Sequence, residues 1–458
     1  MDAGANARAG YAEHAWLAAL LPDRAHRVRV ADRRLAGALE DSGAELVERA
    51  PDVEIGGPAD LRGDAALAVV PLGRLTWGAG RFPARAAARF LASARVRMQA
   101  TASRRALERL GYAHTAAVGW DHTHELRVPD LPAQSLSGRR LVEYLPRCRL
   151  VFGWRTVLGR SLLRSALEDA SAASGSSLEP TSILARGGFV VAIAGSVLLR
   201  VAVGPARGQI ASQLSALDAL RASRAPDVVA ARVPWPTARG RSGLADWSLE
   251  LLLPGRPARP PLSHGLLAQC LDFLVALHSI GHAGEPPSCA DASAVLAPAC
   301  APAEAEVVRE LARRLDRELA PLSRGFGHGD FFSGNLLVED ERLLGVVDWD
   351  AGGPGRLPLL DLLQLTFLAR HRPSDLSWGP TLVRKLLPWA RRGGDDLARE
   401  YCRRVGLDPG PPLLEALVLA YWLDRAAYQL RTHAERWDQR AWLDANIRSV
   451  IEHIRHAT

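Results

Sequence analysis

The sequence predicts an α+β protein in which a small α/β region is followed by a β-rich segment and then by a long helical one. Two apolar, β-branched runs, 189–194 and 196–203, are separated by Gly195, which is typical of a β-hairpin. From residue 358 onward, apolar residues recur at helical spacing. The length of 458 residues exceeds that of one ordinary domain, so we expect at least one boundary.

Residues 1–170 are predicted to form a degenerate α/β domain of unknown role. Short apolar runs indicate strands at 26–30, 65–70 and 115–128, and helical spacing indicates helices at 34–47 and 103–110. The block RRALERLGYAHTAAVGWDHTHELRVP resembles the closing helix and hairpin of class I methyltransferase-like domains. The turn after the first strand, VADRR, lacks the glycines of a dinucleotide site, so no working cofactor site is expected here.

A boundary is expected at 171–180, where small and polar residues without periodicity are typical of a flexible linker. The domain that follows, 181–458, is predicted to consist of a β-rich part (181–255) and a helical part (256–458). Further elements are predicted in it from local periodicity: helices at 209–220 and 266–278, and a strand at 249–253.

Composition excludes several classes of function. No stretch approaches the roughly 20 apolar residues of a membrane helix, so no membrane insertion is expected. The start does not resemble a secretory signal, which favours a cytoplasmic protein. Five scattered cysteines form no CxxC pair, so neither a disulfide framework nor a zinc site is indicated. The net charge of +7 is spread without a basic run, so no nucleic-acid partner is indicated. The sequence makes no prediction of an oligomeric state.

The most informative stretch is GHGDFFSGNLLVEDERLLGVVDWDAGGPGRLPLLDL, residues 327–362. Asp330 lies in a turn, and Asn335 directly precedes the apolar run 336–338. A second apolar run, 343–347, ends at Asp348 after a polar turn. Two strands joined in this way form a hairpin, so Asn335 and Asp348 are expected to lie close together.

These residue types suit phosphoryl transfer, which needs a group to receive the proton of the acceptor and oxygen ligands for Mg²⁺. Magnesium prefers carboxylate and amide oxygens together with water and phosphate. Asn335 and Asp348 supply such oxygens, and Asp330 is left for the hydroxyl of the acceptor.

At this point the sequence resembles the aminoglycoside phosphotransferase and choline kinase family, whose pattern is HGDxxxxN followed by a hydrophobic strand and a D-W-[DE] element. The resemblance implies a protein-kinase-like fold of two lobes over about 181–458, with ATP or another nucleoside triphosphate and Mg²⁺ as cofactors. It also implies that Asp330 is the catalytic base and that Asp330→Asn abolishes transfer while leaving the melting temperature nearly unchanged. The matching residues are His328, Gly329, Asp330, Asn335, Asp348, Trp349, Asp350, Gly355 and Asp361, with Asn335 and Asp348 as magnesium ligands and His328 and Asp361 as structural residues.

The resemblance extends to the β-rich part, with two departures. Where the family has a phosphate-binding lysine, this chain has Arg200, and where it has the paired glutamate, this chain has Gln213. Arginine keeps the charge with a different geometry, and glutamine leaves only a neutral hydrogen bond. Further nucleotide contacts are expected from a glycine pair and from the backbone of the inter-lobe strand: Gly187, Gly188, Leu251 and Leu253.

The acceptor is expected to be neutral or anionic, such as a sugar or a phosphorylated metabolite, rather than an aminoglycoside. From residue 362 to the end there are fifteen Lys and Arg residues and eleven Asp and Glu residues, and this positive balance does not attract polycations. Two alternatives stay open. In the first, the domain is a nucleotide-binding regulatory module with little turnover, which Arg200 and Gln213 favour. In the second, the main activity lies in the N-terminal region, with a cofactor pocket between residues 26 and 130.

Overall fold

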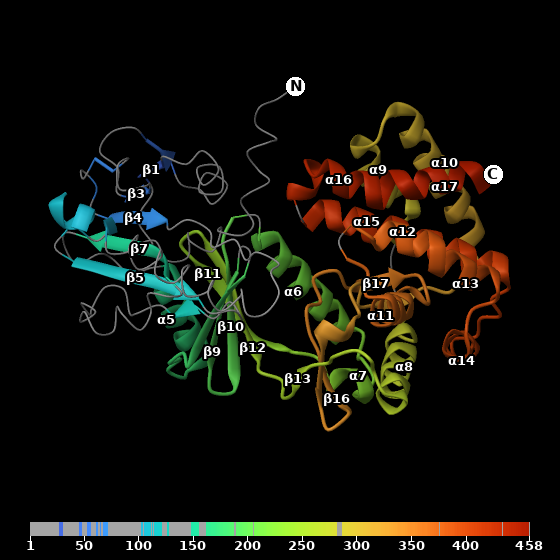
Figure 1. The fold of residues 1–458 in the computed structure, drawn as a ribbon. Coiled ribbons are helices and arrows are strands. Elements are labelled where there is room, and N and C mark those ends of the chain that lie inside the picture. Colours follow the sequence, from blue (N-terminus) through green and yellow to red (C-terminus); the bar gives the residue numbers. More distant parts are fainter. Residues whose placement is uncertain are drawn as a thin grey trace, which may run out of the picture. The chain divides into compact units, whose positions relative to one another are not determined.

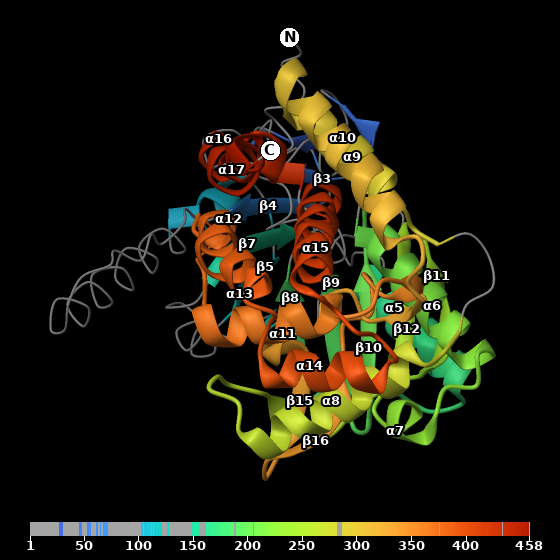
Figure 2. The same ribbon diagram turned by 90° about the vertical axis from the view of Figure 1, so that its right-hand side faces the viewer.

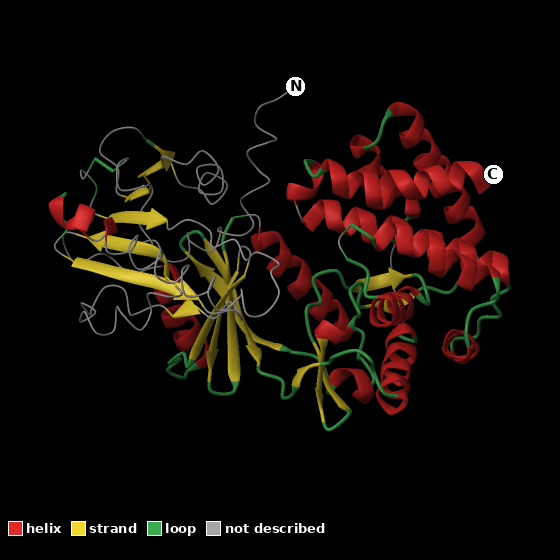
Figure 3. Ribbon diagram, viewed as in Figure 1, coloured by secondary structure: helices red, strands yellow, loops and turns green. Residues whose placement is uncertain are grey.

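We describe a computed structural model of the chain, covering two compact units. Unit 1 is formed by residues 1–208 and 237–251, and unit 2 by residues 209–236 and 252–458. Figure 3 shows that strands dominate the first and helices the second. The structure describes residues 27–30, 45–47, 53–55, 61–62, 65, 67–71, 102–103, 105–110, 112, 114–120, 126–127, 148–154, 162–186, 189–204, 206–281, 286–374, 376–432 and 434–457.

Unit 1 contains a seven-stranded mixed sheet in the order β2-β1-β3-β4-β7-β5-β6 (Figure 1). The first four strands in this order run parallel to one another, and β7 lies antiparallel between β4 and β5. The strands are β1 (Arg27–Val30), β2 (Glu45–Leu46), β3 (Val53–Ile55), β4 (Leu67–Pro71), β5 (His114–Trp120), β6 (Leu126–Arg127) and β7 (Cys148–Trp154). The expected helix at 34–47 is wrong at its end, because Glu45 and Leu46 pair with β1 as a strand.

A second sheet of unit 1 is antiparallel, in the order β11-β12-β10-β9-β8. The predicted hairpin at Gly195 is confirmed, since β9 and β10 pair directly around it. Inward residues of these strands form one core with helix α5, and Val190, Leu199 and Leu249 are fully or almost fully buried. The strands are β8 (Ser182–Arg186), β9 (Phe189–Ala194), β10 (Val197–Ala202), β11 (Pro236–Ser242) and β12 (Ala245–Leu251).

Helix α5 (Leu162–Ser174) corrects the start of the predicted linker at 171–180, because the helix continues through the first four of these residues. Ala166 and Ala170 of α5 are completely buried in the core of unit 1. The hydroxyl of Ser171 donates to the Leu167 carbonyl and accepts from the Leu178 backbone N–H, which ties the following turn to the helix. The small residues that suggested flexibility are therefore compatible with a packed helix. The division between the units also falls elsewhere, at 208/209, 236/237 and 251/252.

Helix α15 (Pro411–Thr432) is the central helix of unit 2. Figure 2 shows α12 and α13 on one side of it and α9 and α10 on the other. The helices are α6 (Ala206–Ala222), α7 (Asp227–Ala230), α8 (His264–His278), α9 (Cys289–Leu296), α10 (Pro302–Leu319), α11 (Leu360–His371), α12 (Trp378–Thr381), α13 (Leu387–Arg391), α14 (Asp396–Arg404), α15, α16 (Arg440–Leu443) and α17 (Ser449–Ala457). Short 3-10 or π segments adjoin them: η3 (Ala297–Ala299), η4 (Ser333–Asn335), η5 (Leu382–Leu386), η6 (Ala434–Trp437) and η7 (Asp444–Arg448).

Local sequence explains where several of these helices begin. The Ser263 hydroxyl accepts from the Leu266 N–H at the start of α8, and Ser288 forms a capping box with Asp291 at the start of α9. The carboxylate of Asp395 caps α14 in the same way. Each side chain satisfies a backbone donor that the first helical turn leaves without a partner.

Unit 2 also contains two small sheets that carry the HGD motif. β13 (Arg256–Pro257), β15 (Leu336–Glu339) and β16 (Arg342–Val346) form one, and β14 (Gly325–Gly327) pairs with β17 (Gly353–Arg356) in the other. The predicted hairpin of β15 and β16 is confirmed. Its turn residues, Asp340 and Glu341, both have a positive φ. Helices predicted at 209–220 and 266–278 correspond to α6 and α8. None of the helices in the described ranges is long and apolar enough to cross a membrane.

Candidate phosphoryl-transfer site

The loop between β14 and η4 begins with a turn that Asp361 holds through backbone hydrogen bonds. The two carboxylate oxygens of Asp361, in the first turn of α11, accept from the N–H groups of His328 at 2.7 Å and Gly329 at 2.8 Å. Gly329 has φ +77°, and a Cβ there would lie 2.1 Å from the Ala351 carbonyl oxygen. Only glycine fits this turn, because both the backbone angle and the space exclude a side chain.

His328 is completely buried and joins the loop to the hairpin. Its Nε2 lies 3.0 Å from the Val347 carbonyl oxygen, and its ring packs 4.6 Å from the Trp349 ring. The indole N–H of Trp349 donates in turn to the Val346 carbonyl at 2.8 Å. Since Val347 directly precedes Asp348, His328 fixes the position of this aspartate relative to the loop.

Asn335 contacts Asp330 and the residue that precedes Asp348. Its side-chain amide donates to the Asp330 carbonyl at 3.0 Å, and its own carbonyl accepts from the Val347 N–H at 3.0 Å. Asn335 is buried, whereas Asp348 is partly exposed and adopts a left-handed backbone with φ +63°. The three predicted residues Asp330, Asn335 and Asp348 therefore belong to one loop and the hairpin that follows it.

The donor set fits magnesium better than a transition metal. With its amide nitrogen turned to Asp330, Asn335 keeps Oδ1 as the atom able to bind a cation, and Asp348 adds a carboxylate. No cluster of three or more His, Cys, Asp or Glu suited to a metal occurs among the described residues. Mg²⁺ does not need such a cluster, because it retains waters and takes phosphate oxygens in addition to one or two protein ligands.

The carboxylate of Asp330 is held from behind by two residues that the sequence analysis did not identify. Gln364 of α11 donates its side-chain N–H to Oδ1 of Asp330 at 2.8 Å. Arg425 of α15 forms an ion pair with the same oxygen at 2.9 Å. A charged residue in the apolar helix α15 is a signal that could have been used, since a buried arginine requires an anionic partner.

Arg425 has further contacts that fix its guanidinium. It donates to the Gly329 carbonyl at 2.6 Å and lies over the Tyr428 ring at 4.5 Å. Burial lowers the pKa of Arg425, yet Asp330, Tyr421, Asp424 and Tyr428 together outweigh it, and the pKa lies above its ordinary value. The tyrosine hydroxyls are also bound, Tyr421 to Gln364 and Tyr428 to Asp350.

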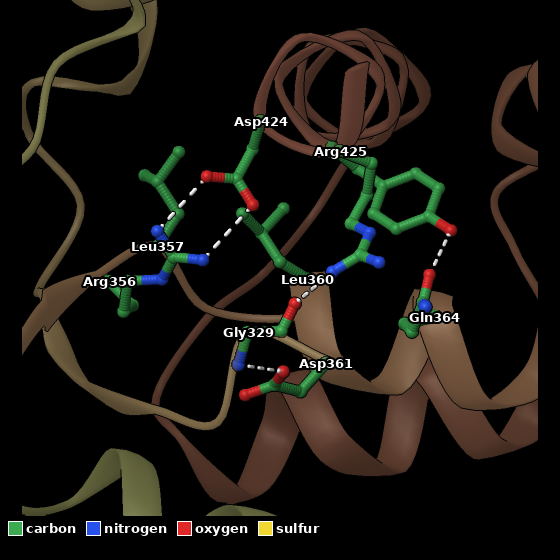
Figure 4. A pocket seen from close by; sticks show the side chains of 9 residues that line it. Gly329, Arg356, Leu357, Leu360, Asp361, Gln364, Asp424 and Arg425 are labelled. Carbon is green, nitrogen blue, oxygen red and sulfur yellow. Dashed lines mark hydrogen bonds and ion pairs between the residues drawn. The ribbon is translucent and has the colours of Figure 1, made fainter. Parts of the chain in front are cut away.

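Gly329, Gln364 and Arg425 also line a small pocket beneath the loop (Figure 4). On its other side, Arg356 of β17 forms two hydrogen bonds, each 3.0 Å long, with the carboxylate of Asp424. The pocket thus contains two guanidinium groups that are both matched by carboxylates. Its remaining lining residues are Leu357, Leu360, Asp361 and Tyr421.

In unit 1, Arg200 of β10 has an acidic partner that the sequence analysis did not identify. Its Nε lies 3.7 Å from Oε1 of Glu250, on the adjacent strand β12. Glu250 is almost fully buried and also accepts a hydrogen bond of 2.8 Å from the Ser248 hydroxyl. The family pattern had directed attention to the helix position Gln213, and Glu250 was missed because it lies on a strand.

The other predicted nucleotide contacts are placed as follows. Gln213 is buried on α6. Leu251 ends β12 with 46% of its surface exposed, and Leu253 packs near Gly345 of β16. Gly187 and Gly188 lie outside the described residues.

Residues 189–401 match the model of the phosphotransferase enzyme family. The matched segment covers slightly less than half of the chain, and over it the chain is similar to that family. The match includes every residue of the HGD and D-W-D motifs and ends before α15, so Arg425 lies outside it. No curated protein matches the chain.

Solved structures with similarity to the chain include phosphotransferases of antibiotics. Macrolide 2′-phosphotransferase MphH from Brachybacterium faecium is 20% identical over 62% of this chain and 98% of its own, with a TM-score of 0.39. Aminoglycoside phosphotransferase APH(3'')-Id from Streptomyces rimosus is 16% identical over 57% of this chain and 96% of its own, with a TM-score of 0.38. The similarity to the phosphotransferase enzyme family rests on the family match and not on these structures.

Proposed function

We propose that the chain is an ATP- and Mg²⁺-dependent phosphotransferase that phosphorylates a hydroxyl of a small molecule. The observation that carries the proposal is the joint placement of Asp330, Asn335 and Asp348 by one loop and one hairpin within the family-matched segment. These residues supply a proton acceptor and two oxygen ligands, which is the set that phosphoryl transfer uses.

In the proposed reaction, Asp330 accepts the proton of the acceptor hydroxyl as its oxygen attacks the γ-phosphorus of ATP. A new oxygen–phosphorus bond forms, the bond from the γ-phosphorus to the bridging oxygen breaks, and ADP leaves. Asn335 and Asp348 would hold magnesium, whose positive charge would offset the negative charge of the phosphates. His328 and Asp361 keep the loop in place through the backbone contacts described above.

Arg200 is proposed to contact the nucleotide phosphates, oriented by Glu250 rather than by a helix glutamate. A buried carboxylate beside the guanidinium favours one orientation of the arginine and restores the acidic partner that Gln213 cannot supply. Gly187, Gly188 and the backbone of Leu251 and Leu253 are kept as proposed nucleotide contacts.

A neutral or anionic acceptor is the better fit. The arginines that line the pocket beneath Gly329 pair with Asp330 and Asp424 and offset the negative charge that would attract a polycation. The excess of basic residues from position 362 to the end also disfavours binding of a polycation.

Calorimetric titration with ATP, with and without Mg²⁺, tests the nucleotide part on the wild-type chain and on Asp348→Ala. We expect binding that strengthens with Mg²⁺ in the wild type and loses this dependence in the variant. Release of ADP in the presence of a panel of sugars, polyols and aminoglycosides then tests transfer. A chain that binds ATP and never turns it over supports the alternative, a nucleotide-binding regulatory module, which the arginine in place of lysine at position 200 favours.

A further inference from the structure

The two oxygens of the Asp330 carboxylate have different surroundings. Oδ1 receives the N–H of Gln364 at 2.8 Å and the guanidinium of Arg425 at 2.9 Å. For Oδ2, the contact found among the described residues is the amide nitrogen of Asn335 at 3.5 Å, the upper limit of a hydrogen bond. The side chain of Asp330 is 18% exposed. One oxygen is thus held from the protein interior, and the other is held much more weakly.

Both groups that hold Oδ1 are themselves fixed. Gln364 is 4% exposed and accepts from the hydroxyl of Tyr421, which sets the amide so that its nitrogen points to Asp330. Arg425 is 7% exposed, and its second nitrogen donates to the Gly329 carbonyl. A rotation of Asp330 would break a charge-assisted hydrogen bond and leave a buried guanidinium without its anion.

Stability alone does not account for this arrangement. A buried ion pair often contributes no more to stability than apolar side chains of similar volume, because removing two charges from water is costly. Around this position α15 buries Tyr421, Trp422, Leu423 and Ala426, and the neighbouring Asp424 already pairs with Arg356. An arginine here therefore calls for a role in the chemistry of the residue that it contacts.

We infer that Arg425 and Gln364 are positioning residues that hold Oδ1 of Asp330, so that Oδ2 is the atom that receives the proton of the acceptor hydroxyl. The inference rests on the proposed function. The proton moves from the acceptor to Oδ2 while the acceptor oxygen bonds to the γ-phosphorus and ADP departs. Gln364 lies within the family-matched segment, and Arg425 lies on α15, beyond its end.

The test compares Gln364→Met, Arg425→Lys and Arg425→Met with the wild type. Turnover is measured as ADP release from Mg·ATP, first with water as acceptor and then with the best acceptor of the panel. Gln364→Met keeps the volume and removes a neutral donor, so it stays informative if Arg425→Met fails to fold. Arg391→Met is the matched control. Arg391 of α13 pairs with Glu415 of α15, the helix that also contains Arg425, and its nitrogens lie 2.7 and 3.0 Å from the carboxylate oxygens of Glu415.

We expect kcat to fall by about 10- to 100-fold in Gln364→Met and Arg425→Met, because a reacting group displaced by about 1 Å costs on this order. The affinity for Mg·ATP, measured by calorimetry, stays within about twofold, since neither residue contacts Asn335 or Asp348 in the described contacts. Arg425→Lys keeps the charge and loses the fork geometry, so its kcat falls between those of Arg425→Met and the wild type. The control Arg391→Met keeps the wild-type kcat.

The outcomes separate this inference from the proposed function. If Asp330→Asn is inactive while Gln364→Met and both Arg425 variants keep the wild-type kcat, positioning by these residues is wrong and the phosphotransferase assignment stands. A parallel fall in kcat and Mg·ATP affinity would reduce Arg425 to a structural residue and would also overturn the inference. A wild-type chain that transfers phosphate neither to water nor to any acceptor contradicts the proposed function itself.

Discussion

The buried guanidinium of Arg425 lies 2.9 Å from the carboxylate of Asp330, the residue proposed to accept the proton. The contact joins the central helix of unit 2 to the HGD loop, and a second hydrogen bond from Arg425 to the Gly329 carbonyl strengthens the same junction. Catalysis and stability are therefore coupled at Asp330, which changes what a substitution of this residue is expected to do.

Asp330→Asn is expected to lower kcat by about 10²- to 10⁴-fold, because the amide cannot accept the proton. The sequence alone led us to expect an unchanged melting temperature. The structure changes that expectation: the variant removes the anion beside Arg425, and we expect a loss of about 2 kcal/mol in the free energy of unfolding. Turnover assays and urea unfolding measure both effects.

Asp272→Asn serves as the control for this prediction. Asp272 forms an exposed ion pair with Arg404 at 2.7 Å, so its neutralisation should change the unfolding free energy by less than about 1 kcal/mol and leave turnover unaffected. Wild-type turnover in Asp330→Asn would show that this carboxylate is not the base.

Gly329→Ala is expected to destabilise the chain and to abolish transfer, since the added Cβ would lie 2.1 Å from the Ala351 carbonyl oxygen. Gly393→Ala is a matched control: φ at Gly393 is +84°, and no atom lies within 4 Å of the added carbon. The control incurs only the cost of a left-handed backbone, about 1 kcal/mol. If the melting temperatures of both variants fall by the same amount, the tight turn at Gly329 is contradicted.

Glu250→Gln is expected to raise the KM for ATP by about 3- to 10-fold with little change in kcat, because Arg200 loses the buried charge that orients it. Asp246→Asn is the control on the same strand, where Asp246 pairs with Arg207 and Arg241. We expect its KM to stay at the wild-type value. Equal KM values for Glu250→Gln and the wild type would argue against Glu250 as the partner that prepares Arg200.

The stability of the chain is expected to fall with acidification through His278. Burial lowers the pKa of His278 below its ordinary value of 6.5, and the charge of Asp361 and a hydrogen bond with the Ser323 backbone offset this only in part. Because the folded-state pKa lies below the unfolded one, the unfolded state binds the proton first. The stabilisation from neutral His278 is thus complete above about pH 6.5 and is lost as pH falls through the lower folded-state value.

Urea unfolding of the wild type and of His278→Gln, at about pH 7.5 and at about pH 5.5, measures this effect. His371 and His453 also have lowered pKa values, so the difference between the two chains isolates His278. We expect the wild type to lose more unfolding free energy than the variant between the two pH values. An identical loss in both chains would contradict the assignment to His278.

The parts of the site that the sequence predicted are those that lie close together along the chain. Asp330, Asn335 and Asp348 belong to one loop and one hairpin, so their spacing along the sequence determines their positions relative to one another. Arg425 and Glu250 were missed because each reaches its partner through tertiary pairing, one from a distant helix and the other across a sheet. No local pattern records which strands or helices will be neighbours.

The elements of the fold that local sequence determines were likewise predicted, and those that tertiary pairing determines were not. The hairpin at Gly195 and helix α8 have clear periodicity and were predicted close to their observed bounds. The strand at Glu45 and Leu46 was taken as helix because its apolar spacing fits both periods, and pairing with β1 decided the outcome. Ser171 to Ser174 suggested a linker by composition, yet the burial of Ala166 and Ala170 before them keeps the chain helical.

The position of Arg425 along the chain has a consequence for biosynthesis. A ribosome releases the HGD loop, the hairpin and helix α11 well before α15, so a growing chain contains every motif residue while Asp330 still lacks its buried cation. Asp330, the proposed proton acceptor, acquires its final surroundings only when α15, near the end of unit 2, has folded against it. Folding of α15 and completion of the surroundings of Asp330 are thus a single event.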